Sequence, residues 1–328
     1  MTNRLRLSMA MGDYDHVRDL AAGAVVAEGI DILPLDLPVE EIFYRFLKHR
    51  EWDVSEISLA KYSAMVSQGD TSLVGIPVFP SRVFRHSSMY VRADSGIDHP
   101  SKLRGARVGI PEWAQTAAVY SRGLLVHEYG VPLTEIDWYQ AGVNQAGRKE
   151  KVQLERPEGV SYTPVPDRSL SDMLVKGDLE AVLSAHSPDS FEHGDGTVVR
   201  LFRDAAVVER DYHSKTGIFP IMHTVVIRAD IVDANPWVPS NLYTAFQEAK
   251  RRSLARISDM TISRFPVPWL QDHLANTAID GDPWPYGIEE NRVTLEAFLG
   301  FAHEQGVLRS ALRAEQLFSS AIDAGYRI

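Results

Sequence analysis

Short apolar segments alternate with segments of helical periodicity along the first part of the chain, and this alternation constrains the fold more than any other feature. Strand–helix alternation of this kind produces a mainly parallel sheet with helices packed on its faces. The N-terminal part is therefore predicted to be an α/β lobe. Its strands are expected at residues 4–10, 30–37, 52–58 and 73–79, and its helices at residues 14–29, 39–49 and 59–67.

A second α/β unit is expected after residue 98. Residues 147–167 are charged and rich in proline, which indicates a surface excursion within this unit. Strands are expected at residues 106–110, 135–139 and 179–185, and helices at residues 114–129 and 169–177. An apolar strand at 219–228 and helices at 245–257, 288–305 and 314–324 complete the pattern.

The two units predict an α/β protein with two lobes. The chain is expected to leave the first lobe at residues 83–92, build the second, and return at residues 223–230. Ligands of open α/β sheets bind at the carboxyl ends of the strands, so a central cleft that closes by hinge motion is expected to hold the ligand. Lobe I would comprise residues 1–90 and 223–328, and lobe II residues 91–222.

Charge and cysteine content exclude several functions. The 328 residues include 34 Lys and Arg, 44 Asp and Glu and no cysteine, so the formal net charge is −10. An acidic chain lacks the clustered cations that nucleic-acid binding requires. Without cysteine there is no disulfide, no thiolate nucleophile and no cysteine-ligated metal site. The chain also lacks G-x-S-x-G, P-loop and G-x-G-x-x-G motifs, which disfavours serine hydrolases, NTPases and dinucleotide enzymes.

The sequence shows no signal for export or membrane insertion. Residues 1–11 carry two arginines without an apolar region long enough for a signal peptide. The longest stretch without a charged residue, residues 234–247, has about 14 residues and falls short of the ~20 that a membrane helix needs. A cytoplasmic protein is therefore predicted. A homo-oligomer is also expected, and Phe298, Phe301 and Phe318 are candidates for its subunit interface.

Several stretches, spread over nearly the whole chain, resemble one known family: residues 14–15, 43–45, 53–58, 76–86, 103–111 with 115–116, 217–228, and 282–287 with 290–291. The most specific are Pro-Ser-Arg-Val-Phe-Arg-His at 80–86, Pro-Ile-Met-His at 220–223 and Pro-Trp-Pro-Tyr-Gly at 283–287. The chain resembles the 4,5-dihydroxyphthalate decarboxylase family, which has the type II periplasmic-binding-protein fold. The resemblance implies a cytoplasmic lyase that removes one carboxylate from a dihydroxylated phthalate, giving protocatechuate and carbon dioxide.

An aromatic dicarboxylate needs cations, and two arginines in the most specific stretch are candidates to bind it. The planar guanidinium forms two parallel hydrogen bonds to a carboxylate, which suits Arg82 and Arg85 to this role. In an extended segment Arg82 and His86 would share a face while Arg85 points away. The alternative is a pair of solvated or inter-lobe arginines at a hinge.

The helix expected after Pro111 is a second candidate anion site. Its free backbone N–H groups and the Thr116 hydroxyl would favour a carboxylate, and Trp113 could stack on an aromatic ring. The alternative is an ordinary capped helix with Trp113 in the core. Glu112 weakens the anion interpretation unless its side chain points away.

Decarboxylation of a hydroxylated aromatic acid needs a proton donor near the ipso carbon and a base near the phenol. Histidine titrates in the right range, and His223 or His86 is expected to be the general acid. His186 and His16 are further candidates. Glu56 and Ser58, at the end of an expected strand, could hold or deprotonate the catechol hydroxyls; a helix-start carboxylate is the alternative for Glu56. The remaining candidates for substrate binding are Tyr14, Ser58 and His186.

Metal ligands show no recognisable spacing. His186, Glu192 and His193, or Asp211 and His213, match no tight ligand motif, so we expect no required metal, although a catechol could share a divalent cation with Glu or His. Two other functions stay open. One is a solute-binding protein or ligand sensor for a small carboxylate without chemistry. The other is a lyase or isomerase that acts on a different hydroxylated acid.

Overall fold

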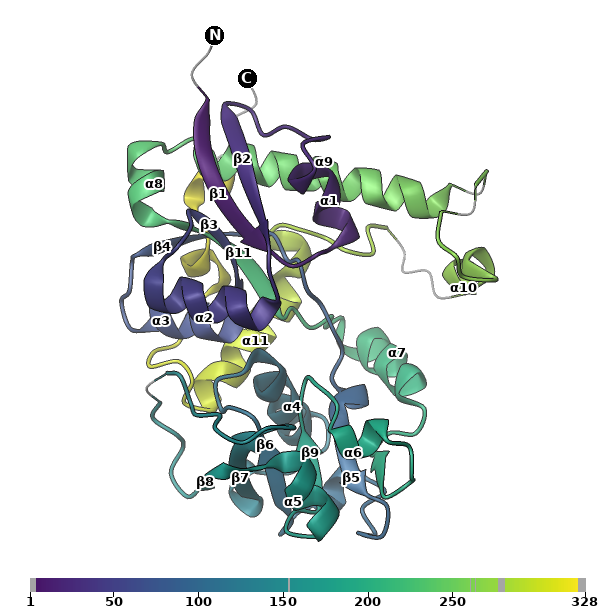
Figure 1. Cartoon of the computed structure of the whole chain (residues 1–328). Coiled ribbons are helices and arrows are strands. Elements are labelled where there is room, and N and C mark those ends of the chain that lie inside the picture. The colour runs from purple at the N-terminus through teal and green to yellow at the C-terminus, as the bar shows by residue number, and fades with distance from the viewer. Residues whose placement is uncertain (1–3, 153, 260, 263, 277–280, 324–328) are drawn as a thin grey trace.

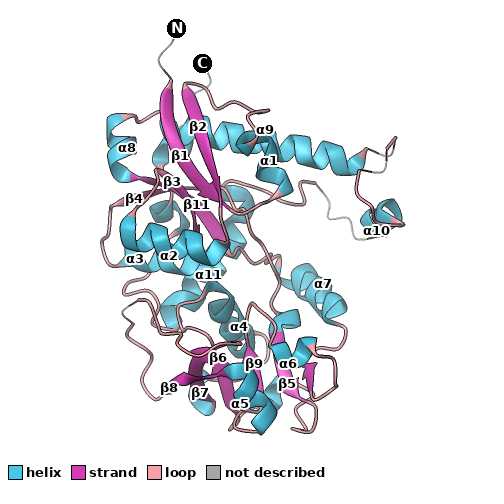
Figure 2. Cartoon of the chain, in the orientation of Figure 1, coloured by secondary structure: helices cyan, strands magenta, loops and turns pink. Residues whose placement is uncertain are grey.

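Two α/β lobes lie one above the other, and each is built on its own sheet (Figure 1). The structure is a computed structural model and describes residues 4–152, 154–259, 261–262, 264–276 and 281–323. Figure 2 shows that helices surround the strands of both lobes. The predicted two-lobed α/β class is therefore confirmed, with mixed rather than mainly parallel sheets.

The sheet of the first lobe contains β1 (Leu5–Met11), β2 (Ile30–Asp36), β3 (Val54–Ser58), β4 (Leu73–Ile76) and β11 (His223–Arg228). Its order is β2-β1-β3-β11-β4, with β1, β2 and β3 parallel and β11 antiparallel to both its neighbours. Val225, Val226 and Ile227 are fully buried, which matches the inner position of β11. A strand from late in the chain thus completes the sheet that the N-terminal segment begins.

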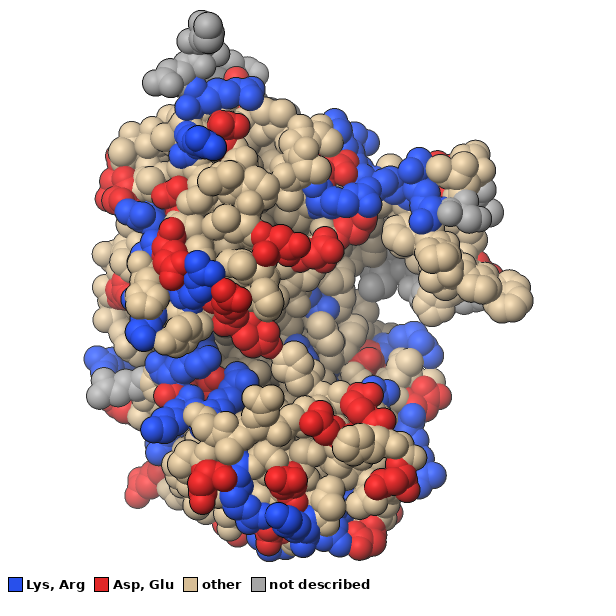
Figure 3. All heavy atoms as spheres, in the orientation of Figure 1, with Lys and Arg blue, Asp and Glu red and all other residues tan. Residues whose placement is uncertain are grey.

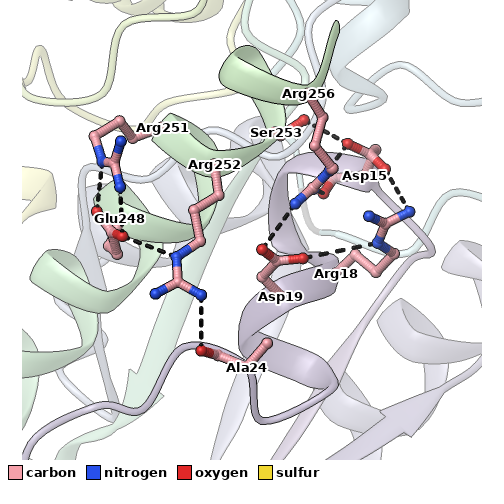
Figure 4. Close-up of polar contacts among 9 residues, drawn as sticks. All are labelled: Asp15, Arg18, Asp19, Ala24, Glu248, Arg251, Arg252, Ser253 and Arg256. Atoms are coloured by element: carbon pink, nitrogen blue, oxygen red, sulfur yellow. Dashed lines mark hydrogen bonds and ion pairs between the residues drawn. The ribbon is translucent and has the colours of Figure 1, made fainter. Parts of the chain in front are cut away.

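Helices of the first lobe are α1 (Asp15–Ala21), α2 (Val39–His49), α3 (Leu59–Ser67), α8 (Ala229–Ala234) and α9 (Val238–Ser258). An ion-pair network fastens α1 to α9 (Figure 4). Arg256 pairs with Asp15 at 3.0 Å and with Asp19 at 2.7 Å, and the Ser253 hydroxyl donates to Asp15 at 2.6 Å. Because these partners come from far apart in the chain, the network fixes the short helix α1 at the end of β1.

The sheet of the second lobe contains β5 (Met89–Arg92), β6 (Arg107–Ile110), β7 (Asp137–Gly142), β8 (Ser161–Ser169), β9 (Ala181–Leu183) and β10 (Val198–Arg200). Its order is β10-β5-β9-β6-β7-β8. The helices of this lobe are α4 (Thr116–His127), α5 (Leu170–Lys176), α6 (Asp189–Glu192) and α7 (Ala205–Thr216). Ser169 caps α5 by accepting a hydrogen bond from the Asp172 N–H, as the capping pattern predicts.

The C-terminal segment contacts both lobes. Helix α11 (Arg292–Glu304) packs on α4 of the second lobe, where the rings of Phe298 and Tyr120 lie 5.2 Å apart. The 3₁₀ helix η5 (Ala314–Leu317) and helix α12 (Ser320–Asp323) return to the first lobe. Phe298, Phe301 and Phe318 are all buried within the chain, so the proposal that they form a subunit interface is wrong.

Several expected element boundaries differ from the structure. The helix expected over 14–29 ends at Ala21, two residues before Gly23, which adopts a φ of 72°. The excursion expected at 147–167 contains most of β8, an edge strand whose exposed positions lack an apolar pattern. The helix expected over 314–324 is two short pieces, and residue 324 lies outside the described residues.

The chain crosses between the lobes at other residues than the sequence indicates. β5 pairs in the second sheet from Met89, and β11 pairs in the first sheet from His223. The crossing segments are therefore residues 77–88 and 217–222, rather than 83–92 and 223–230. We retain the division into residues 1–90 with 223–328 and residues 91–222 as a proposal. In the described part of the chain, no helix is long and apolar enough to span a bilayer.

Candidate active site

Three strand ends of the first lobe bring the main polar cluster together. β1 and β3 are parallel neighbours, so the residues after Met11 lie beside the end of β3. β11 runs antiparallel to β3, and its first residue, His223, pairs with Ser58. The cluster therefore forms at the carboxyl edge of the sheet, as expected for an open α/β fold. It comprises Gly12, Tyr14, Glu56 and His223.

The Glu56 carboxylate is the centre of this cluster. It is fully buried on β3 and lies within hydrogen-bond distance of three groups. Oε1 accepts from the Tyr14 hydroxyl at 2.6 Å and lies 2.6 Å from Nδ1 of His223. Oε2 accepts from the Gly12 N–H at 2.9 Å. Three partners around one buried carboxylate fix its position and satisfy most of its accepting capacity.

The surroundings of Glu56 favour its ionised form. Burial opposes ionisation, but the hydrogen bonds and charge of His223, together with the Tyr14 and Gly12 donors, outweigh it and lower the pKa of Glu56. Burial and the adjacent carboxylate raise the pKa of Tyr14 far above its ordinary value, so its hydroxyl stays a donor. Because a carboxylate only accepts hydrogen bonds, Nδ1 of His223 must carry a proton.

His223 presents its other ring nitrogen away from Glu56. Nε2 makes no hydrogen bond with any residue that the structure describes, and the side chain is 18% exposed whereas Glu56 is sealed. The ring of Phe43 meets the imidazole edge-on, with the centroids 4.9 Å apart. The pair thus has a fixed tautomer and an available Nε2, which can take or give a proton.

Arg85 contacts Met222, the residue before His223, and lacks a counter-ion among the described residues. The side chain is 94% buried, yet among the described residues it makes no ion pair. Its Nε donates to the Met222 sulfur at 3.2 Å, and one terminal nitrogen lies 3.5 Å from the Ser88 hydroxyl. Burial lowers the pKa of Arg85 to about 10, which leaves it charged at neutral pH. A buried cation with such weak partners is an available anion-binding group.

Polar contacts between the lobes surround this cluster. Oγ of Ser58 lies 2.9 Å from the Thr116 hydroxyl oxygen, which also accepts from the Ala60 N–H at 3.0 Å. The buried Lys61 pairs with the buried Glu112 at 2.9 Å. These contacts join α3 of the first lobe to the start of α4 in the second. The predicted residues Ser58 and Thr116 are therefore in contact with each other across the boundary.

His186 lies at the exposed rim of the boundary. Its Nε2 is 2.6 Å from a carboxylate oxygen of Glu40, at the start of α2 in the first lobe. The hydrogen bond raises the pKa of His186, and the same bond is the main reason that the pKa of Glu40 falls to about 2. This pair is a second contact between the lobes, and the structure does not place His186 against Glu56.

Two predicted site residues lie in the protein interior instead. His86 is fully buried, and its ring contacts Tyr129, Phe202 and Tyr212 at centroid distances of 5.2–6.4 Å. Both its ring nitrogens are sealed from solvent without a partner. His86 is therefore not placed to protonate a ligand near His223, because it packs in the core of the second lobe. The segment is not extended at His86, because the chain turns into a 3₁₀ helix at residues 86–88.

Trp113 is the second of these residues. It is fully buried, its Nε1 donates to the Gln305 carbonyl at 2.8 Å, and the guanidinium of Arg122 lies 3.9 Å above its ring. The core interpretation of Trp113 therefore holds, and stacking on a substrate is excluded. The backbone N–H groups of Trp113 and Ala114 donate to Glu150, at 2.5 and 3.3 Å. The expected anion site before α4 is thus occupied by a carboxylate of the chain itself.

The remaining predicted residue, Arg82, lies in the crossing segment and faces away from the cluster. Backbone carbonyls and the Asn291 side chain accept its hydrogen bonds. The His16 ring touches the cluster through Tyr14, at a centroid distance of 5.4 Å, and also packs against Trp284 and Tyr286. Burial lowers the pKa of His16 to about 4. Of the candidates, the structure brings together Tyr14, Glu56 and His223, with Ser58, Thr116 and Arg85 nearby.

Sequence reasoning missed several contributors to this site. Gly12 supplies a backbone donor to Glu56, and a Cβ there would lie 3.0 Å from the Tyr14 ring. Phe43 and Met222 set the surroundings of His223 and Arg85. Gly12 could have been found from its position directly after an expected strand. Phe43 faces inward on an amphipathic helix, which by itself indicates only core packing.

Charge on the surface does not mark the site. Figure 3 shows Lys and Arg interspersed with Asp and Glu on both lobes, with the surface recessed between them. Among the described residues, no group of three or more His, Asp or Glu side chains is arranged to hold a metal ion.

Comparison with solved structures shows the class of fold. The aliphatic sulphonate binding protein SsuA from Escherichia coli has a TM-score of 0.54 and 14% identity, over 96% of this chain and 97% of SsuA. The desulfurization enzyme DszB has a TM-score of 0.51 and 14% identity, over 98% of each chain. The chain is therefore a two-lobed protein of the periplasmic-binding-protein type.

Comparison with curated proteins shows the family. The 4,5-dihydroxyphthalate decarboxylase of Comamonas testosteroni is 37% identical over 99% of this chain and 100% of its own length. That of Pseudomonas putida is 37% identical over 64% of this chain and 82% of its own length. This chain belongs to the 4,5-dihydroxyphthalate decarboxylase family. No protein-family model matches the chain.

Proposed function

We propose that this protein is a carboxy-lyase that converts 4,5-dihydroxyphthalate to protocatechuate and carbon dioxide. Membership of the family supports the reaction and the substrate. The observation that carries the proposal is the His223–Glu56 pair, in which a buried carboxylate holds Nδ1 and leaves Nε2 available. This is the arrangement that a general acid–base histidine requires.

His223 acts as the general acid in this proposal. Nε2 gives its proton to the ring carbon that bears the leaving carboxylate, so a C–H bond forms there. The hydroxyl para to that carbon gives its proton to solvent, and the ring becomes a ketone-like intermediate. The C–C bond then breaks, carbon dioxide leaves, and the bonding electrons restore the aromatic ring. The ketone-like oxygen takes a proton back from solvent and becomes the hydroxyl of the product. Glu56 orients the imidazole and stabilises its cation rather than contacting the substrate, because three donors already occupy it.

Arg85 is proposed to bind a substrate carboxylate. Its guanidinium is next to Met222, which directly precedes His223 in the chain. A charge-assisted hydrogen bond contributes roughly 1.5–3 kcal/mol, and a bidentate pair would make two of them. Tyr14 acts through Glu56 as a positioning residue, while Ser58 and Thr116 are proposed to contact the catechol or to fix lobe closure.

Assay of carbon dioxide and protocatechuate from the purified protein with 4,5-dihydroxyphthalate tests this function. His223→Ala is expected to abolish turnover while it retains binding of phthalate, which lacks the hydroxyls. His213→Ala is a matched control, since His213 contacts Phe84 and Phe219 away from Glu56. Tight binding with no product from the wild-type protein, with or without a divalent metal, would instead support a binding protein or sensor.

We also propose that the protein is a cytoplasmic homo-oligomer. Helix α10 (Leu270–Asn276) stands apart from both lobes beyond α9 (Figure 1). The preceding residues expose large apolar side chains, with Val267 55% and Trp269 82% exposed. An indole this exposed favours an interface. Light scattering after size exclusion tests this: Trp269→Ser should lower the molar mass if the segment joins subunits, and a monomeric wild-type protein would contradict the proposal.

A further inference from the structure

Arg82 lies where the two crossing segments meet. Its backbone forms an isolated antiparallel bridge with Ile221, and the N–H of Met222 donates to the Ser81 carbonyl at 2.8 Å. These contacts join residues 77–88 to residues 217–222, the two segments that connect the sheets of the two lobes. Figure 1 shows segments of the chain that run between the two lobes. The position of Arg82 is therefore at a hinge.

The Arg82 guanidinium bonds to chain segments rather than to a carboxylate. One terminal nitrogen donates to the Phe219 carbonyl at 3.2 Å, in the second crossing segment. The other donates to the Pro285 carbonyl at 2.7 Å and to the Asn291 side chain. Its Nε is sealed and has no partner. The side chain thus ties three separate segments together and offers no accessible donor pair to a substrate.

Aromatic rings enclose the same guanidinium. Its central carbon lies 5.3 Å from the Phe79 ring centroid, 5.2 Å from that of Phe219 and 6.0 Å from that of Trp284. The indole N–H of Trp284 donates to the Phe79 carbonyl at 2.8 Å. Rings of this kind stabilise a desolvated cation. Arg82 can therefore stay charged and buried without a counter-ion, and its place is fixed on all sides.

Asn291 extends this contact to the second lobe. Its amide nitrogen donates to the Pro285 and Gly287 carbonyls, at 2.9 and 2.8 Å, so the residue is firmly held. It directly precedes α11, which packs on α4. Arg82 thus joins both crossing segments to a helix that rests on the second lobe.

The proposed catalytic groups are attached to the same two segments. His223 follows the second crossing segment directly, and Arg85 lies three residues after Arg82 on the first. Any change in the alignment of the segments moves His223 relative to Arg85. We propose that Arg82 is a positioning residue, and this inference rests on the proposed function. Together with Asn291, Arg82 holds the two crossing segments in place. It thereby sets the position of His223 relative to the substrate bound by Arg85.

Kinetics of three variants test this role. Arg82→Lys keeps the positive charge but loses the planar guanidinium with its several donors. Asn291→Ala removes one hydrogen-bond acceptor of Arg82 and leaves Arg82 itself in place. Both are expected to lower kcat by about 10- to 100-fold with KM changed less than about threefold, since small misplacement of reacting groups acts on kcat. The double variant should be no worse than the poorer single variant, because both remove the same lock.

Arg122→Lys is the matched control. Arg122 is also a buried arginine without a carboxylate; it bonds to Gln305 and the Trp113 carbonyl in the second-lobe core. This variant should lower thermal stability without changing kcat or KM at a temperature where it is folded. A purely structural role for Arg82 would give that same pattern, and such a result would overturn the proposal. A rise in KM alone for Arg82→Lys, absent from Asn291→Ala, would overturn it in favour of substrate contact.

A distance measurement tests the lock without turnover. The chain has no cysteine, so Tyr44→Cys on α2 and Val175→Cys on α5, which are 49% and 48% exposed, can carry spin labels in opposite lobes. Arg82→Lys and Asn291→Ala should broaden the inter-lobe distance distribution, and Arg122→Lys should not. Unchanged distributions in both variants would overturn the proposal. If the wild-type protein fails to decarboxylate the substrate, the function is wrong, and these distributions still decide whether Arg82 sets the hinge.

Discussion

Replacement of Glu56 by glutamine separates positioning of His223 from the mere presence of an imidazole. In the wild-type protein the ionised carboxylate accepts from Tyr14 on one oxygen and from Gly12 on the other, while Nδ1 of His223 lies 2.6 Å away. A glutamine is nearly the same size but presents one donor in place of one acceptor. In one orientation the new NH₂ group would face the Gly12 N–H, and in the other it would face Nδ1–H of His223. Either orientation places two hydrogen-bond donors against each other.

The loss can be estimated from the contact that changes. The bond between imidazolium and carboxylate is charge-assisted and contributes roughly 1.5–3 kcal/mol. It is strongest when His223 is protonated, the form that gives a proton to the ring. At 1.36 kcal/mol per factor of ten, kcat should fall about 10- to 150-fold in Glu56→Gln. Binding should change little, because Glu56 is sealed from the ligand.

Steady-state release of carbon dioxide and calorimetric binding of phthalate provide the two readouts. Tyr14→Phe is a graded comparison: it removes one donor to Glu56 but keeps the carboxylate, so its loss in kcat should be smaller. Glu135→Gln, which changes an exposed carboxylate paired with Arg104, controls for removal of one charge. If Glu56→Gln keeps kcat within about twofold of the wild-type value while it remains folded, the assignment of Glu56 and His223 as a working pair is refuted.

Two further results are expected. Arg85→Gln should raise KM by about 10- to 100-fold, because a charge-assisted contact with the substrate is lost. The melting temperature should stay unchanged or rise, since a buried unpaired cation is removed. An unaltered KM would argue against substrate contact. Burial lowers the pKa of His86 to about 4, whereas the pKa of histidine in the unfolded chain is near 6.5. The folded state therefore binds this proton less readily, so the contribution of His86 to stability is complete above pH 6.5 and falls by roughly 2–3 kcal/mol by pH 4.5. Urea unfolding of His86→Phe should show a correspondingly weaker loss below pH 6.5, and parallel pH curves would contradict this.

Much of the fold could be predicted because its signals are local. Helix α2 and helix α3 have the bounds that their apolar periodicity predicts, and the Ser169 cap begins α5. Boundaries failed where a tertiary contact decides the end of an element. Edge strand β8 lacks a buried face to mark it, and α9 begins earlier than its pattern suggests, at Val238.

The site could be predicted only in part, because its groups are joined by register rather than by spacing. Tyr14, Glu56 and His223 come from three segments, and their contact depends on β11 pairing with β3 so that His223 lies opposite Ser58. Strand identity is readable from the sequence, but this register is not. The position of His86 next to Arg85 predicts a role in the site, but adjacency does not specify where a side chain points when the chain turns into a 3₁₀ helix.

The hydrogen bonds of the buried arginines distinguish Arg85 from Arg82 and Arg122, which residue type alone does not. Arg82 and Arg122 are both buried without a carboxylate, but backbone carbonyls and an amide oxygen accept their hydrogen bonds and aromatic rings cover their faces. Arg85 is equally buried and has only a thioether and a hydroxyl at 3.5 Å. Desolvating a cation costs several kcal/mol unless acceptors replace water. Folding therefore leaves the charge of Arg85 the least compensated of the three, and a carboxylate bound to Arg85 would recover the most free energy.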